Sequence, residues 1–329
     1  MGYRAEKEKI EKKLYTIKQV VLFVVVVFLL GLCIFSTFCP PIRWKYYVKK
    51  PDVSRRVDGE MRIHFLDVGQ GDCTLIELPD GKVAMIDGGD VSDITAKAIL
   101  RYLNALKIKT IDYLIVTHPD SDHCGSLKKV VQQKEVLNAY LPAANPENEG
   151  EAYAEFYQQL LEEDCKRIFA ESGESFGSTD AEYTFTCVYP YVRNEWSDPY
   201  NGESTVVWLD YMGTSAIFMG DATWGTETEL VRNHELGLLE NLGVDLSSTE
   251  ILKVGHHGSN SSTSKEFLQY LNVKASVISC GKNNPYGHPM EEVLQKITDA
   301  GSKTYRTDNN GTVMISVKSS EGFTVKTEK

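Results

Sequence analysis

Four side chains that can bind a metal ion lie within six consecutive residues, namely His118, Asp120, Asp122 and His123. They follow the apolar segment 112–116, which predicts a short buried strand ending just before the first histidine. Alternate residues of an extended loop point the same way, so we expect positions 118 and 120 to share one cation. Positions 122 and 123 then face a second cation. The alternative is a solvated polar loop with a capping aspartate, but four ligands in one short run favour a metal site.

Further ligands are expected at the ends of later strands. Asp221 follows an apolar strand and a glycine, so its carboxylate could bridge two metal ions. His256 and His257 follow the next apolar strand, and either one alone could instead be a core or capping histidine. Asn201 and His288 are weaker candidates. Together with the first run, these residues predict a centre built from several loops.

A pair of divalent ions about 3.5–4 Å apart activates water and stabilises both the attacking and the leaving oxygen in a hydrolysis. Carboxylates at 120, 122 and 221 make the predicted site rich in oxygen, which favours Mn²⁺ more than a site made only of histidines would. Zn²⁺ also accepts mixed nitrogen and oxygen ligands. The expected cofactor is therefore two divalent ions, Zn²⁺ or Mn²⁺.

One more carboxylate, Asp87, ends an apolar strand and precedes two glycines. It is placed to orient a ligand histidine, and the alternative is a simple turn. The segment 65–72 contains glycines, but it lacks the lysine and the following helix of a phosphate-binding loop, so we expect no such site there. His64 and His234 are expected to be structural.

The elements that must position these residues are short strands interleaved with helices, an order typical of a layered α/β domain. Helices are predicted at 93–106, 150–164, 226–234, 264–271 and 290–300. Strands are predicted at 61–66, 74–78, 83–86, 112–116, 165–170, 183–189, 204–210, 215–219, 250–254, 274–280, 303–307, 312–317 and 323–326.

Residues 20–39 form an uncharged apolar run of 20, long enough to cross the hydrocarbon core of a membrane. A soluble core helix would have a polar face, and a cleaved signal peptide would have a small-residue cleavage site, so we expect a single transmembrane anchor. Six Lys or Arg lie on each side of it, which leaves the orientation undecided by charge. We expect 1–19 to be cytoplasmic, 40–60 to be a basic linker and 61–329 to be an extracellular catalytic domain.

The charge of the chain is divided unevenly. Residues 1–60 hold 12 Lys or Arg against 6 Asp or Glu, whereas 61–329 hold 23 against 40, a net charge of −17. A domain with this net charge has no general electrostatic attraction for nucleic acid. Nucleic acid is therefore a possible partner that the charge does not support. The seven cysteines include no CxxC pair, so we expect them to be buried thiols rather than disulfides or zinc ligands.

The sequence resembles the metallo-β-lactamase superfamily, and closely the branch represented by the C-terminal domain of ComEC-type competence proteins. The resemblance lies in seven ordered segments covering about 61–320: FLDVGQGDCTLIELPDGKVAMIDGG, VTHPDSDHCGSL, NGESTVVWLDY, FMGDA, LKVGHHGSNSS, GKNNPYGHP and YRTDNNGTV. It implies a four-layered αβ/βα sandwich preceded here by one transmembrane helix. The competence proteins are polytopic channels, so DNA uptake does not transfer to a chain with one anchor.

The resemblance also implies roles for individual residues. Asp122 would position the attacking water, and Asp87 would orient a ligand. Asn201 stands where other branches place a ligand histidine. The metal ligands would be His118, Asp120, Asp122, His123, Asp221 and one of His256 and His257.

The function expected first is a membrane-anchored, two-metal hydrolase of phosphodiesters, either a nuclease or a phosphodiesterase. The alternative is a hydrolase of small esters in the cell envelope, of the phosphorylcholine esterase or lactonase type. An acidic domain suits a cationic substrate, which the aromatic rings of Trp196, Tyr200 and Trp224 could contact. A third possibility is a metal-binding envelope protein without catalytic activity.

Overall fold

A computed structural model describes residues 2–38, 51, 53–54, 56–191 and 204–329 of the chain. These residues divide into two compact units, Met1–Lys50 and Pro51–Lys329. Each unit is described separately below.

The first unit is the helix α1 (Gly2–Phe38). Its stretch Lys12–Ser36 is long enough and apolar enough to cross a membrane. The predicted apolar run 20–39 falls within this helix except for Cys39, which lies outside the described residues. The length and composition of this stretch fit the expected membrane anchor.

The second unit contains two β-sheets. The first sheet has the strand order β15-β14-β1-β2-β3-β4-β5-β6, so the C-terminal strand β14 pairs with the N-terminal strand β1. Strands β3, β4 and β5 run parallel, and their carboxyl ends therefore lie at one edge of the sheet. The bounds are β1 (Met61–Phe65), β2 (Thr74–Glu77), β3 (Val83–Ile86), β4 (Thr110–Ile115), β5 (Glu135–Leu141), β6 (Lys166–Phe169), β14 (Val313–Ser319) and β15 (Gly322–Thr327).

The second sheet has the order β13-β12-β11-β10-β9-β8-β7. Its strands β10 to β13 are parallel, so the loops after β10 and β11 leave the sheet at the same edge. The bounds are β7 (Ser175–Ser178), β8 (Tyr183–Tyr189), β9 (Val206–Tyr211), β10 (Thr214–Phe218), β11 (Thr249–Lys253), β12 (Ala275–Ile278) and β13 (Lys303–Arg306).

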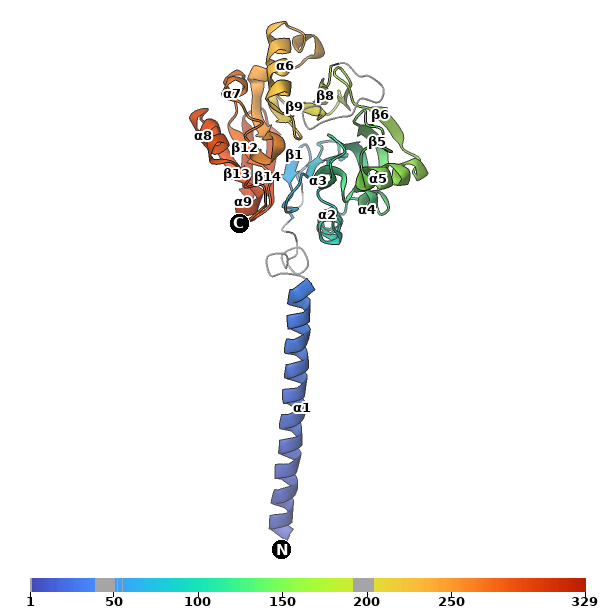
Figure 1. Cartoon of the computed structure of the whole chain (residues 1–329), viewed down its shortest axis with the longest axis vertical. Helices are drawn as coiled ribbons and strands as arrows, with labels where there is room; N and C mark the ends of the chain where they lie inside the picture. The colour runs from blue at the N-terminus through green and yellow to red at the C-terminus, as the bar shows by residue number, and fades with distance from the viewer. Residues whose placement is uncertain (1, 39–50, 52, 55, 192–203) are drawn as a thin grey trace. The chain divides into compact units, whose positions relative to one another are not determined.

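Apolar side chains from both sheets meet in a shared core that includes Phe65, Ile115, Phe185 and Phe218. The outer face of the first sheet packs against α2 (Asp93–Ala105), α4 (Leu127–Val131) and α5 (Glu151–Glu162). The outer face of the second packs against α6 (Trp224–Glu235), α7 (Lys265–Tyr270) and α8 (Glu291–Asp299). The two groups of helices lie on opposite flanks of the domain (Figure 1). The predicted four-layered αβ/βα sandwich is confirmed.

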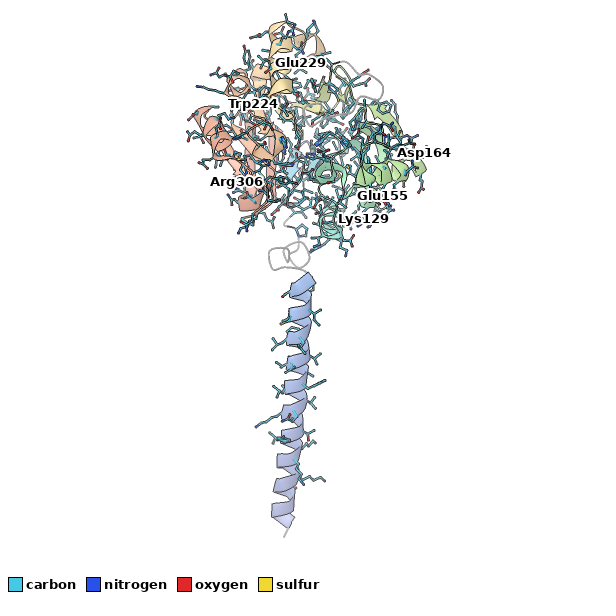
Figure 2. The ribbon with its side chains drawn as sticks, in the orientation of Figure 1. Lys129, Glu155, Asp164, Trp224, Glu229 and Arg306 are labelled. Carbon is cyan, nitrogen blue, oxygen red and sulfur yellow. The ribbon has the colours of Figure 1, made fainter. Side chains whose placement is uncertain are left out.

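Short helical segments complete the domain: α3 (Ser121–Cys124), α9 (Thr307–Asn310), η3 (Glu240–Leu242), η4 (Leu246–Ser248) and η5 (Gly255–Gly258). Charged side chains such as Lys129, Glu155 and Glu229 extend from the outer helices into solvent (Figure 2). Strands β5 and β7 were not predicted, because both begin with polar, exposed residues and lack a continuous apolar run. The five cysteines of this unit are buried, as expected.

The segment that enters β1 is held by a buried ion pair between Glu60 and Arg62. Their side chains are 2% and 5% exposed, and Arg62 Nη2 lies 2.8 Å from Glu60 Oε2. The Val57 N–H donates to the same carboxylate at 2.9 Å, and Ser316 Oγ on β14 donates to it as well. Burial raises the pKa of Glu60, but the hydrogen bonds from Arg62, Ser316 and Val57 outweigh it and lower the pKa to about 2.

We expect Glu60→Gln to destabilise the domain by about 3 kcal/mol at pH 7, because it removes the carboxylate that lies 2.8 Å from the buried Arg62 guanidinium. A carboxylate with a lowered pKa stabilises the fold above its unfolded pKa of 4.5 and loses that effect as the pH falls towards about 2. The difference between wild type and variant should therefore shrink between pH 4.5 and 2. Urea denaturation of the full chain in detergent at several pH values measures it, and a constant difference would contradict the prediction.

Candidate metal centre

The predicted ligands converge because the strands that precede them end at neighbouring places. Asp87 follows β3 and His118 follows β4, which are parallel partners in the first sheet. Asp221 follows β10 and His256 follows β11, which are parallel partners in the second sheet. The loops of the two sheets meet, since the Thr205 N–H donates to the Thr117 carbonyl at 2.8 Å. The site is thus assembled from both sheets.

Asp221 lies at the centre of this cluster, and its side chain is 4% exposed. Its Oδ1 atom is 3.1 Å from His123 Nε2 and 3.6 Å from His257 Nε2. Its Oδ2 atom is 3.9 Å from His118 Nε2 and 3.7 Å from His256 Nε2. Each oxygen of the carboxylate therefore faces two imidazoles, and both His256 and His257 reach the centre.

We expected the run 118–123 to be an extended loop, but part of it is helical. Residues 121–124 form the short helix α3, in which the N–H groups of His123 and Cys124 both donate to the Asp120 carbonyl at 3.0 Å. Asp120 Oδ2 does lie near His118 Nε2, at 3.7 Å. Asp122 instead lies beside His257, with 3.2 Å between Oδ2 and Nε2. The helical turn places Asp122 beside His257 and His123 beside Asp221, and the expectation that the two residues share a second cation stays a prediction.

Each imidazole is held through Nδ1, which leaves Nε2 directed at the centre. Nδ1 of His123 donates to Asp87 Oδ2 at 2.9 Å, and Nδ1 of His257 donates to the Ser279 carbonyl at 2.9 Å. Nδ1 of His118 lies 3.0 Å from Thr117 Oγ1, and Nδ1 of His256 lies 2.8 Å from Ser261 Oγ. Hydrogen bonding at one ring nitrogen sets the tautomer that presents the other to a metal.

Asp87 itself is fully buried and accepts two hydrogen bonds from Thr117, at 2.8 Å from its N–H and 2.7 Å from its hydroxyl. These bonds fix the carboxylate against His123. The position of Asp87 agrees with the predicted orienting function, which is a proposal for this chain.

The polar atoms that face the centre fit a divalent cation. Within the described residues, Nε2 of His118, His123 and His257 and Oδ1 of Asp221 are buried and make no hydrogen bond. Leaving buried polar atoms unpaired costs about 1–3 kcal/mol each. A cation would satisfy them together, and imidazole nitrogen with carboxylate oxygen is a usual donor set for Zn²⁺ or Mn²⁺.

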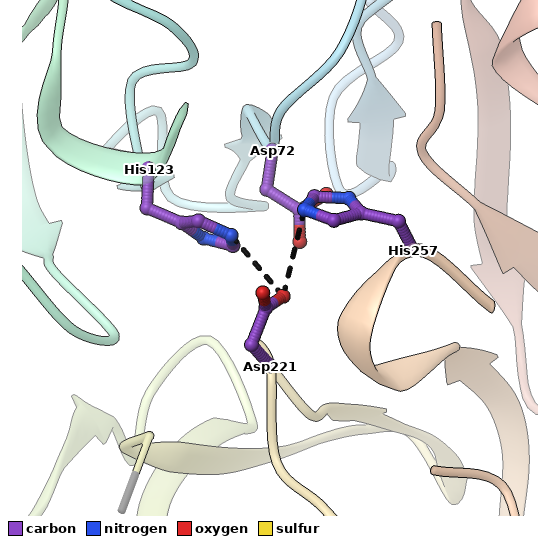
Figure 3. A group of neighbouring side chains, drawn as sticks. All are labelled: Asp72, His123, Asp221 and His257. Atoms are coloured by element: carbon purple, nitrogen blue, oxygen red, sulfur yellow. Dashed lines mark ion pairs between the residues drawn. The ribbon is translucent and has the colours of Figure 1, made fainter. Parts of the chain in front are cut away.

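Asp72 is a further member of the cluster that was not predicted from the sequence. One ligand atom from each of Asp72, His123, Asp221 and His257 lies within 4.8 Å of the others, and Figure 3 shows the four side chains converging. Asp72 Oδ2 also pairs with Lys253 Nζ at 2.5 Å. The signals were an aspartate directly after Gly-Gln-Gly and a lysine inside an apolar strand.

The electrostatics of the cluster bind its groups to one another. Burial, followed by the neighbouring His123, lowers the pKa of His118 to about 3. Burial also acts to lower the pKa of His257, but the carboxylates of Asp221 and Asp72 raise it to about 10. Burial acts to raise the pKa of Asp221, and the surrounding histidines reverse this and hold it well below its usual range. The Asp221 carboxylate thus stays ionised in a buried position, which favours cation binding.

The loop that carries the histidine pair has an unusual backbone. His256 and His257 have φ values of +46° and +52°, in the left-handed region that non-glycine residues seldom adopt. The conformation is held by the His256 N–H, which donates to the Gly220 carbonyl at 3.0 Å, and by the Ser259 N–H, which donates to the His256 carbonyl at 2.8 Å. Strain of this kind concentrates at functional sites, and here it turns two consecutive side chains towards one carboxylate.

The weaker candidates lie at the margin or beyond the described residues. The ring of His288 is 5.7 Å from that of His256, and the exposed Tyr286 stacks on it. Asn201, Trp196 and Tyr200 lie outside the residues that the structure describes.

Residues 66–282 match the model of the metallo-β-lactamase superfamily. The chain belongs to this superfamily. It is a member with a His/Asp cluster of the kind that binds metal in hydrolases.

Comparison with curated proteins supports the resemblance to ComEC-type competence proteins. The chain is 31% identical to ComE operon protein 3 of Bacillus subtilis over 81% of its own length and 34% of the relative. It is 29% identical to competence protein ComA of Neisseria gonorrhoeae, over 78% of its length and 32% of the relative. The chain therefore spans about a third of the length of these relatives. Among solved structures, the metallo-β-lactamase fold protein YhfI of Bacillus subtilis matches with a TM-score of 0.49 and 10% identity, over 77% of this chain and 98% of YhfI.

Proposed function

We propose that this chain is a membrane-anchored hydrolase that uses two divalent metal ions to cleave phosphodiesters. The observation that carries the proposal is the position of Asp221, whose two carboxylate oxygens face different pairs of imidazoles. A carboxylate in this position can bridge two ions. The proposed ligands are His118, Asp120, Asp122, His123, Asp221, His256 and His257, with Asp87 as the orienting carboxylate of His123.

The centre opens to solvent on one side. The side chains of Asp120, Asp122 and His256 are 49%, 27% and 25% exposed, whereas those of His118 and His123 are fully buried. Substrate would approach over the exposed carboxylates. Two divalent ions bound here would lower the pKa of water and stabilise the charge that develops on the phosphate oxygens.

The protein groups have separate tasks in this proposal. Asp122 is half-buried at the open side, so its carboxylate can hold the attacking water by a hydrogen bond and accept its proton. Asp221 and the buried histidines fix the geometry. Asp87 keeps the proton of His123 on Nδ1, so that Nε2 stays available as a donor atom.

Several observations bear on the substrate. Relatives named for competence and recombination make a nucleic acid one candidate phosphodiester. The net charge of −17 over residues 61–329 opposes tight binding of a polyanion. We therefore place small phosphodiesters first and nucleic acid second.

The helix α1 supports a location at the membrane. A stretch that is long and apolar enough to span a membrane would anchor the chain to the lipid bilayer in a single pass. We propose that residues 1–19 are cytoplasmic, that 20–39 cross the membrane and 40–60 form a linker, and that 61–329 act as an extracellular hydrolase domain.

The proposal is tested with purified full-length chain in detergent, loaded with Mn²⁺ or Zn²⁺. The substrates are bis-p-nitrophenyl phosphate, p-nitrophenyl phosphorylcholine, and single- and double-stranded DNA. We expect hydrolysis of the first substrate and a loss of at least about a hundredfold in kcat/KM for Asp122→Asn, which removes the proton acceptor. Asp164→Asn changes an exposed aspartate after α5 and is the matched control. Absence of metal-dependent hydrolysis, or equal rates for both variants, would overturn the proposal.

A small-ester hydrolase of the envelope is the second candidate. Trp224 favours it, since its side chain is 47% exposed and its backbone N–H donates at 2.9 Å to the carbonyl of Ser261, whose hydroxyl lies 2.8 Å from His256 Nδ1. An exposed indole near an acidic centre can contact a cationic group such as choline. Preferential hydrolysis of p-nitrophenyl phosphorylcholine, reduced in Trp224→Ala, would select this function. A chain that binds metal but cleaves none of these substrates would instead be a metal-binding envelope protein.

A further inference from the structure

Lys253 is a charged residue in an unusual position. It ends β11, its side chain is 3% exposed, and its Nζ lies 2.5 Å from Asp72 Oδ2. The same ammonium group donates to the Val254 carbonyl at 2.9 Å. Lysine is almost never fully buried unless it is paired, because its hydration is costly to lose. The pair therefore needs an explanation in the architecture of the centre.

The partner carboxylate lies behind His257 rather than in front of it. Asp72 Oδ1 is 3.4 Å from His257 Nδ1, the nitrogen that donates to the Ser279 carbonyl. The opposite nitrogen, Nε2, faces Asp122 and Asp221. Asp72 thus contacts the side of the ring that points away from Asp221, although it is close enough to the other groups to be counted among potential ligands.

The arrangement resembles the one at the buried His123, with the carboxylate farther from Nδ1, at 3.4 Å. Asp87 lies 2.9 Å from His123 Nδ1 and is fixed by Thr117. A carboxylate at Nδ1 keeps the proton on that nitrogen and makes Nε2 a stronger donor to a metal. The difference is that Asp72 is fixed by an ammonium group, which cancels its charge and occupies the oxygen that points away from His257.

We propose that Asp72 and Lys253 are a positioning pair for His257, and that neither residue binds the metal. Lys253 holds the Asp72 carboxylate against Nδ1 and withholds it from the cation, so that His257 rather than Asp72 supplies the donor atom. This inference rests on the proposed function only in requiring that the centre binds divalent metal; it is independent of the substrate.

The test measures metal binding rather than catalysis. The full chain in detergent and the variants Asp72→Asn, Lys253→Met and the double variant are titrated with Zn²⁺ against a chromophoric chelator. We expect each single variant to bind the same number of ions as wild type with an affinity about 10- to 100-fold lower. Because the two residues act as a unit, the double variant should be no weaker than the weaker single variant. The double variant also leaves no unpaired buried charge, so it can be measured in place of Lys253→Met if that single variant fails to fold.

Two controls separate positioning from other effects. Glu60→Gln breaks a buried ion pair outside the centre, so it should lower stability and leave zinc affinity within about twofold. Asp221→Asn removes a proposed ligand and should reduce the number of bound ions. If Asp72→Asn also reduces that number, Asp72 is a ligand and the inference is wrong. If neither Asp72→Asn nor Lys253→Met changes zinc affinity, the pair only stabilises the fold and the inference is again wrong.

A readout on the metal-free chain separates this inference from the proposed function. The metal-free chain is labelled with ¹⁵N-histidine and studied by NMR. The proton on His257 Nδ1 should give a signal that exchanges slowly with solvent. In Asp72→Asn, the chemical shift of this signal should change and its exchange should become faster. Glu60→Gln should leave it unchanged. If the chain does not cleave phosphodiesters but gives these NMR and zinc-binding results, the proposed substrate is wrong and the positioning pair is supported. An unchanged His257 signal in Asp72→Asn would reject the pair whatever the activity.

Discussion

Replacing Asp221 by asparagine is expected to lower the metal-dependent kcat/KM by at least about a thousandfold. Loss of an orienting partner typically costs a metal site 10- to 100-fold, and Asp221, a proposed ligand, lies beside all four imidazoles of the centre. Asparagine keeps the shape of the side chain and the N–H bond to Ser204 Oγ, so the backbone should be preserved. The loss would then come from charge and from the ability to bridge two ions.

The measurement is hydrolysis of bis-p-nitrophenyl phosphate together with the number of ions bound per chain. Asp210→Asn is a matched control, because Asp210 lies on β9 in the same sheet, is partly buried, and interacts with the Gly213 backbone at the turn to β10. It should retain activity within about twofold. An Asp221→Asn variant that still binds two ions and turns over substrate would remove the basis of the proposed mechanism.

The second large effect is expected at Gly71, where an added methyl group has no room. Its φ is +123°, and a Cβ atom there would lie 2.3 Å from the Asp122 carbonyl oxygen. That carbonyl also accepts the Asp72 N–H at 3.0 Å, so the clash would separate the loop before β2 from the helix α3. We expect Gly71→Ala to destabilise the domain by about 3 kcal/mol or more, combining backbone strain with overpacking. It should also weaken metal binding, because Asp72 and Asp122 both move.

Gly213→Ala is the matched control for this change. Gly213 has a φ of +77° but no atom within 4 Å of an added Cβ, so only the backbone cost of about 1 kcal/mol remains. Urea denaturation of both variants compares the two positions directly. Equal destabilisation would mean that the contact with Asp122 does not constrain the loop.

How far the sequence could predict the site depended on how local the signal was. The run 118–123 and Asp221 were predicted because each follows an apolar segment that is typical of a strand. This signal is local, so it can be seen in the sequence without knowledge of any distant contact. Asp72 and Lys253 were not predicted, because each is buried only as the ion-pair partner of the other, and they are 181 positions apart in the chain. A lysine in an apolar strand is a sign of a buried partner, and it could have been used.

Other features depended on backbone geometry that no pattern reveals. The choice between His256 and His257 stayed open because consecutive residues on an ordinary strand point to opposite sides, whereas the left-handed turn brings both to Asp221. The helix α3 was overlooked because four residues are too few to show a helical period. The layered fold, by contrast, followed from the order of strands and helices, which is a property of the whole sequence.

Assembly of the centre from both sheets has a consequence for how the chain acquires its metal. His118 and His123 follow strands of the first sheet, while Asp221 and His257 belong to loops of the second. A growing chain that crosses a membrane unfolded cannot present a complete set of donor atoms until residue 257 has emerged and both sheets have formed. For the proposed exported domain, the ion would be captured beyond the membrane, so the metal supply of that compartment, rather than that of the cytoplasm, would determine which ion it holds.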